Sequence, residues 1–241
     1  MKAMLLAAGR GERMRPLTDH TPKPLLQAGG KPLIVWHIER LAAAGIRELV
    51  INHAHLGKQL PRTLGDGSKW GVKIAYSDEG TALETAGGIA FALHLLGSEP
   101  FAVVNGDIYC EYDFAAFAHH AAGMQQHGDN CHLVLVNNPE HNLKGDFCLQ
   151  GKRVVPPSSL LSPHSSILTF SGIGIYQPAL FRQIARGTAA PLAPLLREQI
   201  AAGKASGEHY TGTWIDVGTP ARLQQLDNDL TAKHNTQHEK T

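Results

Sequence analysis

Met4-Leu5-Leu6-Ala7-Ala8-Gly9-Arg10-Gly11-Glu12-Arg13-Met14-Arg15-Pro16 is the stretch of this sequence that determines the fold. The apolar run from Lys2 to Ala8 has the length of a buried strand, and a glycine follows it directly. Gly9 and Gly11 permit positive φ and let backbone N–H groups approach a ligand closely. Successive N–H groups in such a loop form a concavity that suits an anion. We therefore expect a buried first strand followed by an anion-binding loop.

Cationic side chains accompany this loop. Arg10, Arg13 and Arg15 lie close together, and a guanidinium matches phosphate oxygens with a rigid two-pronged fork. Downstream, Pro22-Lys23-Pro24 holds a lysine between two prolines, which bias it toward extended geometry. The pattern is not the dinucleotide-binding Gly-x-Gly-x-x-Gly, because position 14 is Met, and no Gly-Lys-Ser/Thr of a Walker A loop follows. An ordinary turn with solvated arginines is the alternative interpretation.

The composition of the 241 residues argues against several classes of function. A formal net charge of +1 provides no global field for nucleic acid or a membrane surface, so phosphate binding must come from local geometry. No stretch approaches the roughly 20 apolar residues of a membrane span. Cys110, Cys131 and Cys148 match neither a disulfide framework nor a zinc spacing, which favours a reducing, cytoplasmic location. His53-x-His55 and His119-His120 lack a Cys or carboxylate at ligand spacing, so solvated histidines are favoured there.

Strands and helices alternate along most of the chain, which is typical of βαβ units and a parallel sheet. We expect one Rossmann-like α/β domain over residues 1–230, with a mostly parallel central sheet and helices on both faces. A polar tail at 231–241 is expected to fray, and a Pro/Ser-rich loop is expected at 156–166. The expected strands are 2–8, 49–51, 72–76, 101–104, 132–136, 147–149, 154–155, 168–176, 208–210 and 213–217. The expected helices are 32–44, 55–64, 84–96, 112–126, one beginning near 178, 192–202 and 220–230.

Two aspartates follow expected strands far apart in the sequence. Asp107 ends Asn105-Gly106-Asp107 after a buried strand, and Asp216 ends another strand before Gly218-Thr219. Ligands of open parallel sheets bind at the carboxyl ends of strands. Two carboxylates there suit one Mg²⁺, which keeps waters and takes its other ligands from substrate phosphates. Each aspartate has an alternative role, Asp107 in a turn and Asp216 as a helix N-cap.

The first loop resembles the signature of the sugar nucleotidyltransferases, Leu-Ala-Gly/Ala-Gly-x-Gly-x-Arg-x-x-Pro-Leu-Thr followed by Pro-Lys-Pro. It stands here as Leu6 to Thr18 and then Pro22-Lys23-Pro24. The resemblance covers residues 2 to about 230 and includes the family's Gly-Asp and Asp-x-Gly-Thr metal motifs. It implies catalytic roles for Arg13 and Lys23 and metal ligation by Asp107 and Asp216. It implies nucleotide contacts at Ala7, Ala8, Gly9, Gly11, Glu79, Glu84, Thr85, Gly88 and Asn105, and sugar contacts at Lys144, Gly145, Asp146 and Gly172.

The segment Leu83–Ile89 matches the place where the family binds the nucleotide base. Thr85 or Glu84 is expected to cap the helix, and Glu84 replaces the family's commoner glycine. Gly87-Gly88 would each cost about 1 kcal/mol in a helix relative to Ala. Close approach of a flat base to the backbone would explain that cost.

The resemblance implies the reaction UTP + sugar 1-phosphate → UDP-sugar + pyrophosphate. Asn105-Gly106-Asp107, Gly145-Asp146-Phe147 and Ser206–Tyr210, in a chain of this length, resemble the N-acetylmuramic acid 1-phosphate uridylyltransferases of bacterial cell-wall recycling. The family's usual Glu-Lys-Pro is missing, which leaves Lys144 as the expected lysine for the sugar phosphate. Lys144 or Arg153 is expected to bind the lactyl carboxylate of that sugar.

Two alternatives stay open at this point. A mannose-1-phosphate guanylyltransferase would share the chemistry and differ in substrate, and a silent nucleotide-sugar sensor would share only the fold. The expected partners are UTP, a sugar 1-phosphate and Mg²⁺, with no nucleic acid or membrane, in a monomer or small homo-oligomer.

Overall fold

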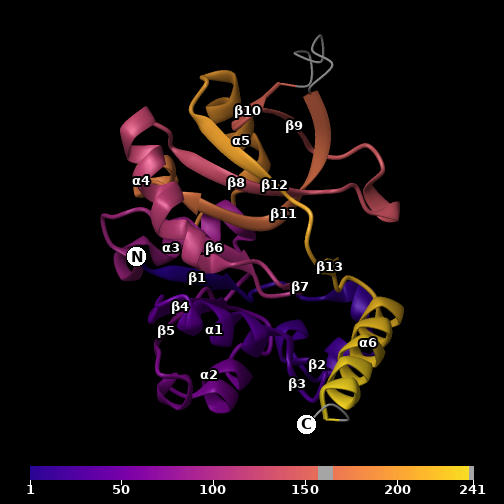
Figure 1. The fold of residues 1–241 in the computed structure, drawn as a ribbon. Coiled ribbons are helices and arrows are strands. Elements are labelled where there is room, and N and C mark those ends of the chain that lie inside the picture. The colour runs from indigo at the N-terminus through magenta and orange to yellow at the C-terminus, as the bar shows by residue number, and fades with distance from the viewer. Residues whose placement is uncertain (157–164, 239–241) are drawn as a thin grey trace.

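The computed structural model describes residues 1–156 and 165–238, and residues 157–164 of the expected Pro/Ser-rich loop lie outside them. Its main feature is a nine-stranded sheet with the order β5-β4-β1-β6-β11-β8-β12-β10-β9 (Figure 1). The strands are β1 (Ala3–Leu6), β4 (Glu48–His53), β5 (Lys73–Asp78), β6 (Phe101–Asn105), β8 (Cys131–Val136), β9 (Phe147–Gln150), β10 (Arg153–Val155), β11 (Ser165–Tyr176) and β12 (Ala205–Tyr210).

The sheet is parallel from β5 to β6, as the sequence predicts, and mixed beyond β6. β1 pairs in parallel with β4 on one side and β6 on the other, β4 pairs in parallel with β5, and β12 with β8. The long strand β11 is antiparallel to both β6 and β8. From β1 the chain builds outward through β4 and β5 and then returns to place β6 on the opposite side. The strand order therefore reverses beside the carboxyl ends of β1 and β6, where open α/β sheets bind ligands.

Helices cover both faces of this sheet because its strands alternate their side chains between two cores. Leu5 packs with α1 (Leu33–Ala43), α2 (Gln59–Leu64) and α4 (Phe117–His127). Its neighbour Met4 packs on the other face with α3 (Glu84–Leu96) and α5 (Leu192–Ala201). This period of two along a strand, with apolar residues on both sides, is what a doubly covered sheet requires.

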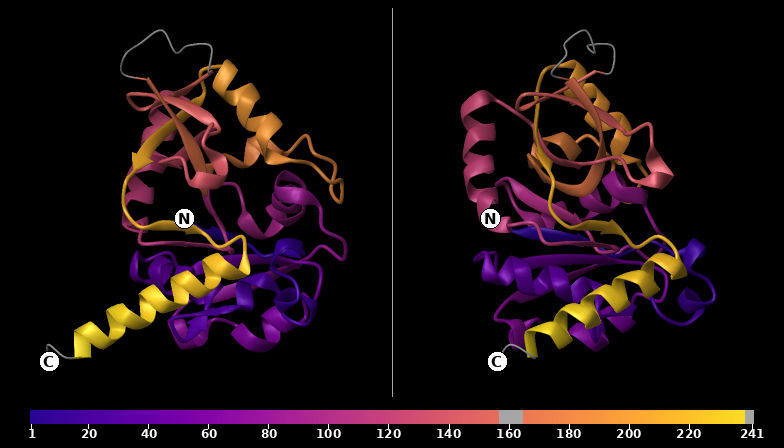
Figure 2. Two further views of the ribbon diagram at one scale, coloured as in Figure 1. Left: turned by 90° about the vertical axis from the view of Figure 1, so that its right-hand side faces the viewer. Right: turned by 45° about the vertical axis from the view of Figure 1, so that its right-hand side comes forward.

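A third, smaller core lies beside the sheet under the last helix, α6 (Pro220–His238). Leu223, Leu226 and Leu230 of α6 pack there against Met14 and Leu33. The short hairpin of β2 (Gln27–Ala28) and β3 (Lys31–Pro32) lies next to α6, which runs along the outside of the molecule (Figures 1 and 2). The C-terminal helix α6 therefore packs against the N-terminal segment that begins at the glycine loop.

The structure differs from the sequence-based expectation at several elements, and α4 begins at Phe117 rather than at 112. α2 begins at Gln59 rather than at 55, and the helix expected near 178 is only a short 3-10 turn, Pro178–Phe181. The strand expected at 213–217 is β13 (Trp214–Asp216), which leaves the main sheet and pairs with β7 (Ile108–Cys110). α6 continues to His238, through most of the tail that was expected to fray.

Contacts within and beside α6 explain its length. Gln224 donates to Asn228 and Gln225 donates to Asp229, one turn apart on the helix. Lys233 forms an ion pair with Glu111 at 2.9 Å. Such i,i+4 contacts support a polar helix that an apolar pattern alone would not predict.

The remaining sequence expectations concern cysteines and membrane spans. All three cysteines are free and buried. In the described part of the chain, no helix combines the length and the apolar character needed to cross a bilayer.

Candidate functional site

The glycine loop turns sharply after β1. Gly11 has φ +65°, in the left-handed region, and its carbonyl accepts a hydrogen bond from Thr18 Oγ1 at 2.8 Å. A Cβ at Gly11 would lie 2.9 Å from Thr18 Cγ2, so both the backbone conformation and the space exclude a side chain. Gly9 has nothing within 4 Å of its would-be Cβ. The loop thus exposes backbone at Gly9 and is closed tightly at Gly11.

A first pocket of about 480 Å³ opens over this loop at the carboxyl ends of β1 and β6. It combines backbone from the glycine loop with side chains from four other segments. The guanidiniums of Arg10 and Arg13 are exposed and make no hydrogen bond or ion pair within residues 1–156 and 165–238. The lining residues are Leu6, Ala7, Ala8, Gly9, Arg10, Gly11, Glu12, Arg13, Met14, Lys23, Pro24, Asn52, Ala82, Glu84, Thr85, Asn105, Asp107 and Gly218.

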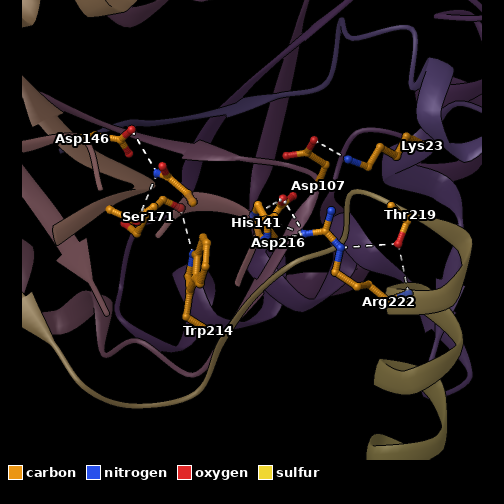
Figure 3. A network of polar contacts seen from close by, with 11 residues as sticks. Lys23, Asp107, His141, Asp146, Ser171, Trp214, Asp216, Thr219 and Arg222 are labelled. Carbon is orange, nitrogen blue, oxygen red and sulfur yellow. Dashed lines mark hydrogen bonds and ion pairs between the residues drawn. The ribbon is translucent and has the colours of Figure 1, made fainter. Parts of the chain in front are cut away.

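Lys23 is held at the wall of the first pocket by Asp107. Lys23 is only 6% exposed, and its Nζ lies 2.6 Å from Asp107 Oδ2 (Figure 3). A buried ammonium needs a counter-charge, because desolvation would otherwise favour its neutral form. Pro22 precedes it in an extended conformation and starts the 3-10 turn Lys23–Leu25. The two residues, far apart in sequence, therefore place one cation and one carboxylate together in the pocket.

Asp216 lies beside this pair but does not line the pocket. Its strand β13 pairs with β7, and the backbone N–H of Val217 donates to the carbonyl of Asp107 at 3.2 Å. Its carboxylate binds Arg222 at 2.8 Å and His141 at 3.1 Å (Figure 3). A Cβ at Gly218, which does line the pocket, would come 3.1 Å from an Asp216 oxygen. Gly218, next to the Asp216 carboxylate, is therefore the residue of this segment that lines the first pocket.

Glu79 and Asn52 brace the back of the pocket. Asn52 Oδ1 accepts a hydrogen bond from the N–H of Ala7 at 2.9 Å, and its Nδ2 donates to Glu79 Oε1 at 2.6 Å. The other Glu79 oxygen accepts from the N–H of Leu83 at 2.9 Å. Burial raises the pKa of Glu79 above its ordinary value. Both oxygens of Glu79 are thus engaged, and Glu79 lines neither pocket.

The paired glycines of α3 have a packing reason that the sequence did not indicate. A Cβ at Gly88 would lie 2.4 Å from Glu79 Oε1, and one at Gly87 would lie 2.4 Å from the carbonyl oxygen of Thr188. Gly88 is buried and lines neither pocket. Close approach of the protein's own groups therefore accounts for both glycines, and the expected contact with a base stays a prediction.

The start of α3 also differs from the expected capping. Neither Thr85 nor Glu84 caps the helix; the carbonyl of Ala190 accepts from the N–H groups of Ala86 and Gly87 at 2.9 and 3.1 Å. Glu84 has φ +59°, a conformation that costs a non-glycine residue about 1–2 kcal/mol. Its side chain lines both pockets. Strain of this kind at a pocket suggests a functional constraint.

A second pocket of about 490 Å³ adjoins the first and shares Glu84, Thr85 and Asn105 with it. Asp146 Oδ2 accepts from the N–H of Phe170 at 2.9 Å, which ties the loop before β9 to β11. Aromatic and aliphatic side chains form one wall, and the exposed guanidinium of Arg197 on α5 forms part of the rim. The lining residues are Glu84, Thr85, Asn105, Asp146, Phe147, Phe170, Pro191, Leu192, Ala193, Leu196 and Arg197.

Gly172 and Gly145 support the second pocket without lining it. The register of β11 against β8 shifts between Phe170 and Ile173, and Gly172 at this bulge has φ +80°. A Cβ there would lie 2.6 Å from Asn105 Nδ2. Gly172 therefore leaves space for Asn105, and Gly145, with φ +63°, packs against Asn138 in the same way.

The two cations expected at the sugar do not line either pocket. Lys144 is exposed on the loop before Gly145. Arg153 forms an ion pair with Asp129 at 2.7 Å. Arg197, which the sequence analysis missed, is the cation that lines the second pocket, and no hydrogen bond or ion pair in the described residues engages it. It lies on an amphipathic helix without any motif, so its sequence gave no signal.

The structure thus gathers most of the expected site residues in two adjoining pockets. Those that line a pocket are Ala7, Ala8, Gly9, Gly11, Arg13, Lys23, Glu84, Thr85, Asn105, Asp107 and Asp146. Those that lie outside both are Glu79, Gly88, Lys144, Gly145, Gly172 and Asp216.

Several known proteins are similar to this chain in sequence. A family model for nucleotidyl transferases matches residues 2–144. The chain is 55% identical over 229 residues to the N-acetylmuramate alpha-1-phosphate uridylyltransferase of Neisseria meningitidis serogroup B, across 93% of this chain and 96% of that protein. It is 31% identical over 232 residues to a mannose-1-phosphate guanylyltransferase catalytic subunit beta of Danio rerio, across 91% of this chain but only 62% of that protein.

Solved structures with low sequence identity share the fold. A Bacillus anthracis protein in complex with sucrose, provisionally described as a glucose-1-phosphate thymidylyltransferase, superposes with a TM-score of 0.83 at 21% identity, over 96% of this chain and 95% of that chain. HddC from Yersinia pseudotuberculosis, complexed with GMP-PN, superposes with a TM-score of 0.75 at 18% identity, over 95% and 98% of the two chains.

Proposed function

Because the chain belongs to the nucleotidyl transferase family, we propose that it joins UTP and N-acetylmuramic acid 1-phosphate into UDP-N-acetylmuramic acid and pyrophosphate. The observation that carries this proposal is the 55% identity to the Neisseria uridylyltransferase, which extends over 93% of the chain and so includes the segments that form both pockets. A product of this kind would serve cell-wall recycling.

In this proposal the first pocket binds UTP. The exposed backbone at Gly9 and the unpaired guanidiniums of Arg10 and Arg13 provide donors for the triphosphate. Arg13 holds the departing β- and γ-phosphates. The far wall, formed by Ala82, Glu84 and Thr85, is left for the nucleoside. Glu79 acts on the nucleotide indirectly, because it holds Asn52, which in turn fixes the N–H of Ala7.

The reaction itself needs positioning and charge more than covalent work from the protein. An oxygen of the sugar phosphate attacks the α-phosphorus in line, a new P–O bond forms, and the bond to the β-phosphate oxygen breaks to release pyrophosphate. No general base is required, since the attacking group is already an anion. Lys23 supplies fixed positive charge where negative charge builds on the α-phosphate.

Mg²⁺ is the cofactor that the proposal includes, with Asp107 and Asp216 as its carboxylate ligands. Both carboxylates already bind cationic groups, Lys23 at 2.6 Å and Arg222 at 2.8 Å, so both positions suit positive charge. Their hard oxygen donors match what Mg²⁺ prefers. When bound, the ion supplies charge neutralisation for phosphate oxygens. The pairing with Arg222 means that Asp216 must share or exchange its present partner.

The second pocket binds the sugar 1-phosphate. N-acetylmuramic acid differs from N-acetylglucosamine by a lactyl group that carries a carboxylate, so a selective pocket needs a local cation. Arg197 is the cation that lines this pocket and has no described partner. We assign the lactyl carboxylate to Arg197 in place of Lys144 or Arg153, because a guanidinium binds a carboxylate with two parallel hydrogen bonds.

The test is a substrate matrix that measures pyrophosphate release. Four nucleoside triphosphates would be combined with the 1-phosphates of N-acetylmuramic acid, N-acetylglucosamine and mannose. We expect the highest kcat/KM with UTP and the acidic sugar, by at least about tenfold over N-acetylglucosamine 1-phosphate. A maximum with GTP and mannose 1-phosphate would instead support guanylyl transfer, and no turnover with any pair would support a silent sensor.

A further inference from the structure

Three residues outside both pockets converge on one point. His120 on α4, His132 on β8 and Glu208 on β12 each offer a ligand atom, and these atoms lie within 4.8 Å of one another. None of the three lines either pocket. In the sequence, His119-His120 has no Cys or carboxylate at ligand spacing, which favoured solvated histidines there. The fold supplies that carboxylate from a distant strand.

The sheet and α4 explain why these residues meet. β8 and β12 are parallel neighbours, with Ser206 opposite His132 and Glu208 opposite Val134. Val134 belongs to the core on the α4 side. His132 lies two residues before Val134 on β8, and Glu208 is paired with Val134 across the two strands, so both side chains face α4 as well. The ring of His120 stacks on that of His132 with centroids 4.2 Å apart and planes inclined by 13°.

The distances suit a tetrahedral ion. Glu208 Oε1 lies 3.3 Å from His120 Nε2 and 3.6 Å from His132 Nε2. Ligand atoms about 2.0–2.2 Å from a tetrahedral zinc are about 3.3 Å from one another. Both Nε2 atoms are buried and make no hydrogen bond. Two unpartnered nitrogen atoms therefore lie at zinc-ligand separations from one carboxylate oxygen, and one ring must turn out of the stack for both lone pairs to point at a single ion.

A hydroxyl lies next to the other nitrogen of the His132 ring. Ser206 Oγ is 3.1 Å from His132 Nδ1 and 3.4 Å from the carbonyl oxygen of Cys131, so it can accept from Nδ1–H while it donates to that carbonyl. In the neutral ring, Nε2 then carries a lone pair. The His132 side chain is only 6% exposed. A lone pair directed at the Glu208 carboxylate would bind a cation that lies between them.

We propose that His120, His132 and Glu208 form a zinc site that ties α4 to β8 and β12. Two imidazoles and one carboxylate are a ligand set that zinc accepts, with the fourth position left to water, while the Tyr112 hydroxyl donates to Glu208 Oε1 and orients the carboxylate. His120 and Glu208 are partly exposed, at 19% and 32% of their side chains, and so give the ion a path from solvent. The His132–Ser206 bond is the outer-shell contact that fixes a ligand ring.

Zn²⁺ itself is the probe for the first experiment, with the full chain freed of metal by a chelator. We expect one equivalent to bind in a calorimetric titration and to raise the melting temperature, and a chelator to reverse the rise. Co²⁺ in its place should give the intense visible absorption of a tetrahedral site with nitrogen ligands. A chain that binds no stoichiometric Zn²⁺ and gives only the weak spectrum of hydrated Co²⁺ would overturn the proposal.

Variants locate the site. His120→Ala and Glu208→Gln should each weaken Zn²⁺ binding by at least about 100-fold, since even outer-shell changes cost 10- to 100-fold. The matched control is His119→Ala, which removes an exposed histidine beside the site and should change the affinity less than about twofold. His120→Ala should also retain nucleotidyl transfer. Unchanged Zn²⁺ affinity in both His120→Ala and Glu208→Gln would place the ion elsewhere and refute the assignment.

Discussion

Lys23 combines burial with a direct contact to a carboxylate of the first pocket, and its charge is proposed to act in the transition state. We expect Lys23→Met to lower kcat about 10²- to 10³-fold and to change KM much less, because a fixed charge matters most where charge builds. Arg15→Ala is the control, since Arg15 pairs with Asp19 and lines neither pocket. Steady-state pyrophosphate release measures both. A Lys23→Met enzyme with parental turnover would remove Lys23 from the mechanism.

Substitution of Asp107 or Asp216 should change how activity depends on Mg²⁺, whereas substitution of other acidic residues should not. Asp107→Asn and Asp216→Asn each remove a full charge while keeping the shape of the side chain, so each should weaken Mg²⁺ and abolish most turnover. Activity measured against Mg²⁺ concentration tests this, with Asp113→Asn, which is exposed and lines neither pocket, as a control. If the Mg²⁺ dependence of a variant overlays that of the parent, the substituted aspartate is not a ligand of the ion.

Substitutions of Arg197 and Lys144 are expected to have different effects on sugar selectivity. A charge-assisted contact is worth about 1.5–3 kcal/mol, which corresponds to roughly 10- to 150-fold in affinity. Arg197→Ala should therefore reduce the preference for N-acetylmuramic acid 1-phosphate over N-acetylglucosamine 1-phosphate by about tenfold or more. Lys144→Ala, which removes an exposed lysine outside the pocket, should leave that ratio unchanged. The kcat/KM ratio for the two sugars decides between them, and the reverse outcome would restore the assignment to Lys144.

Helices α3 and α4 each contain a glycine that can be substituted, and the surroundings of the two glycines differ. Gly88→Ala would place a methyl group 2.4 Å from Glu79 Oε1 and 3.0 Å from Asn52 Nδ2, so it should destabilise the fold by about 1–3 kcal/mol. Gly123→Ala in α4 meets nothing within 4 Å and should stabilise the protein by up to about 1 kcal/mol. Urea unfolding measures both. If Gly88→Ala is as stable as the parent, Gly88 does not pack against the Asn52–Glu79 brace.

The order of strands and helices could be predicted because each leaves a local period in the sequence. The apolar runs at β1, β4 and β6 end at glycine or polar residues, and α1 carries apolar residues at helical spacing. β13 could not be assigned to its small sheet, because pairing with β7 is a contact between residues about a hundred positions apart. The extent of α6 was missed for a related reason, since its stabilising contacts are polar.

At the scale of the whole molecule, site residues that lie within a dense sequence motif could be predicted, and site residues that lie outside any motif could not. The glycine loop, Lys23 and Asp107 sit in short patterns of unusual composition, and the structure places them in one pocket. Arg197 and the group of His120, His132 and Glu208 leave no such pattern, because they come together only when β12 joins the sheet and α4 and α5 pack on it. Their identification required the fold.

Acid stability is the last expectation, and it rests on His37 inside α1. The ring is fully buried, its Nε2 donates to the carbonyl of Ile108 at 2.8 Å, and its Nδ1 has no hydrogen-bond partner. Burial lowers the pKa of His37 to about 4, with the nearby Arg40 acting in the same direction. The unfolded chain binds this proton near pH 6.5 and the folded chain only near pH 4. Stability from His37 is therefore fully present above pH 6.5 and is lost as the pH falls toward 4, by roughly 3 kcal/mol in total.

His37→Gln tests this expectation, because a glutamine can still donate to the Ile108 carbonyl but does not titrate in this range. Urea unfolding at a series of pH values between 7 and 4 should show a smaller loss of stability in His37→Gln than in the parent. His119→Gln, which changes an exposed histidine, should follow the parental curve and so accounts for the general effect of removing one histidine. The carboxylates of the chain are common to all three proteins, so their titration cancels in the comparison. Parallel curves for the parent and His37→Gln would show that His37 accepts its proton equally well in the folded and unfolded chains.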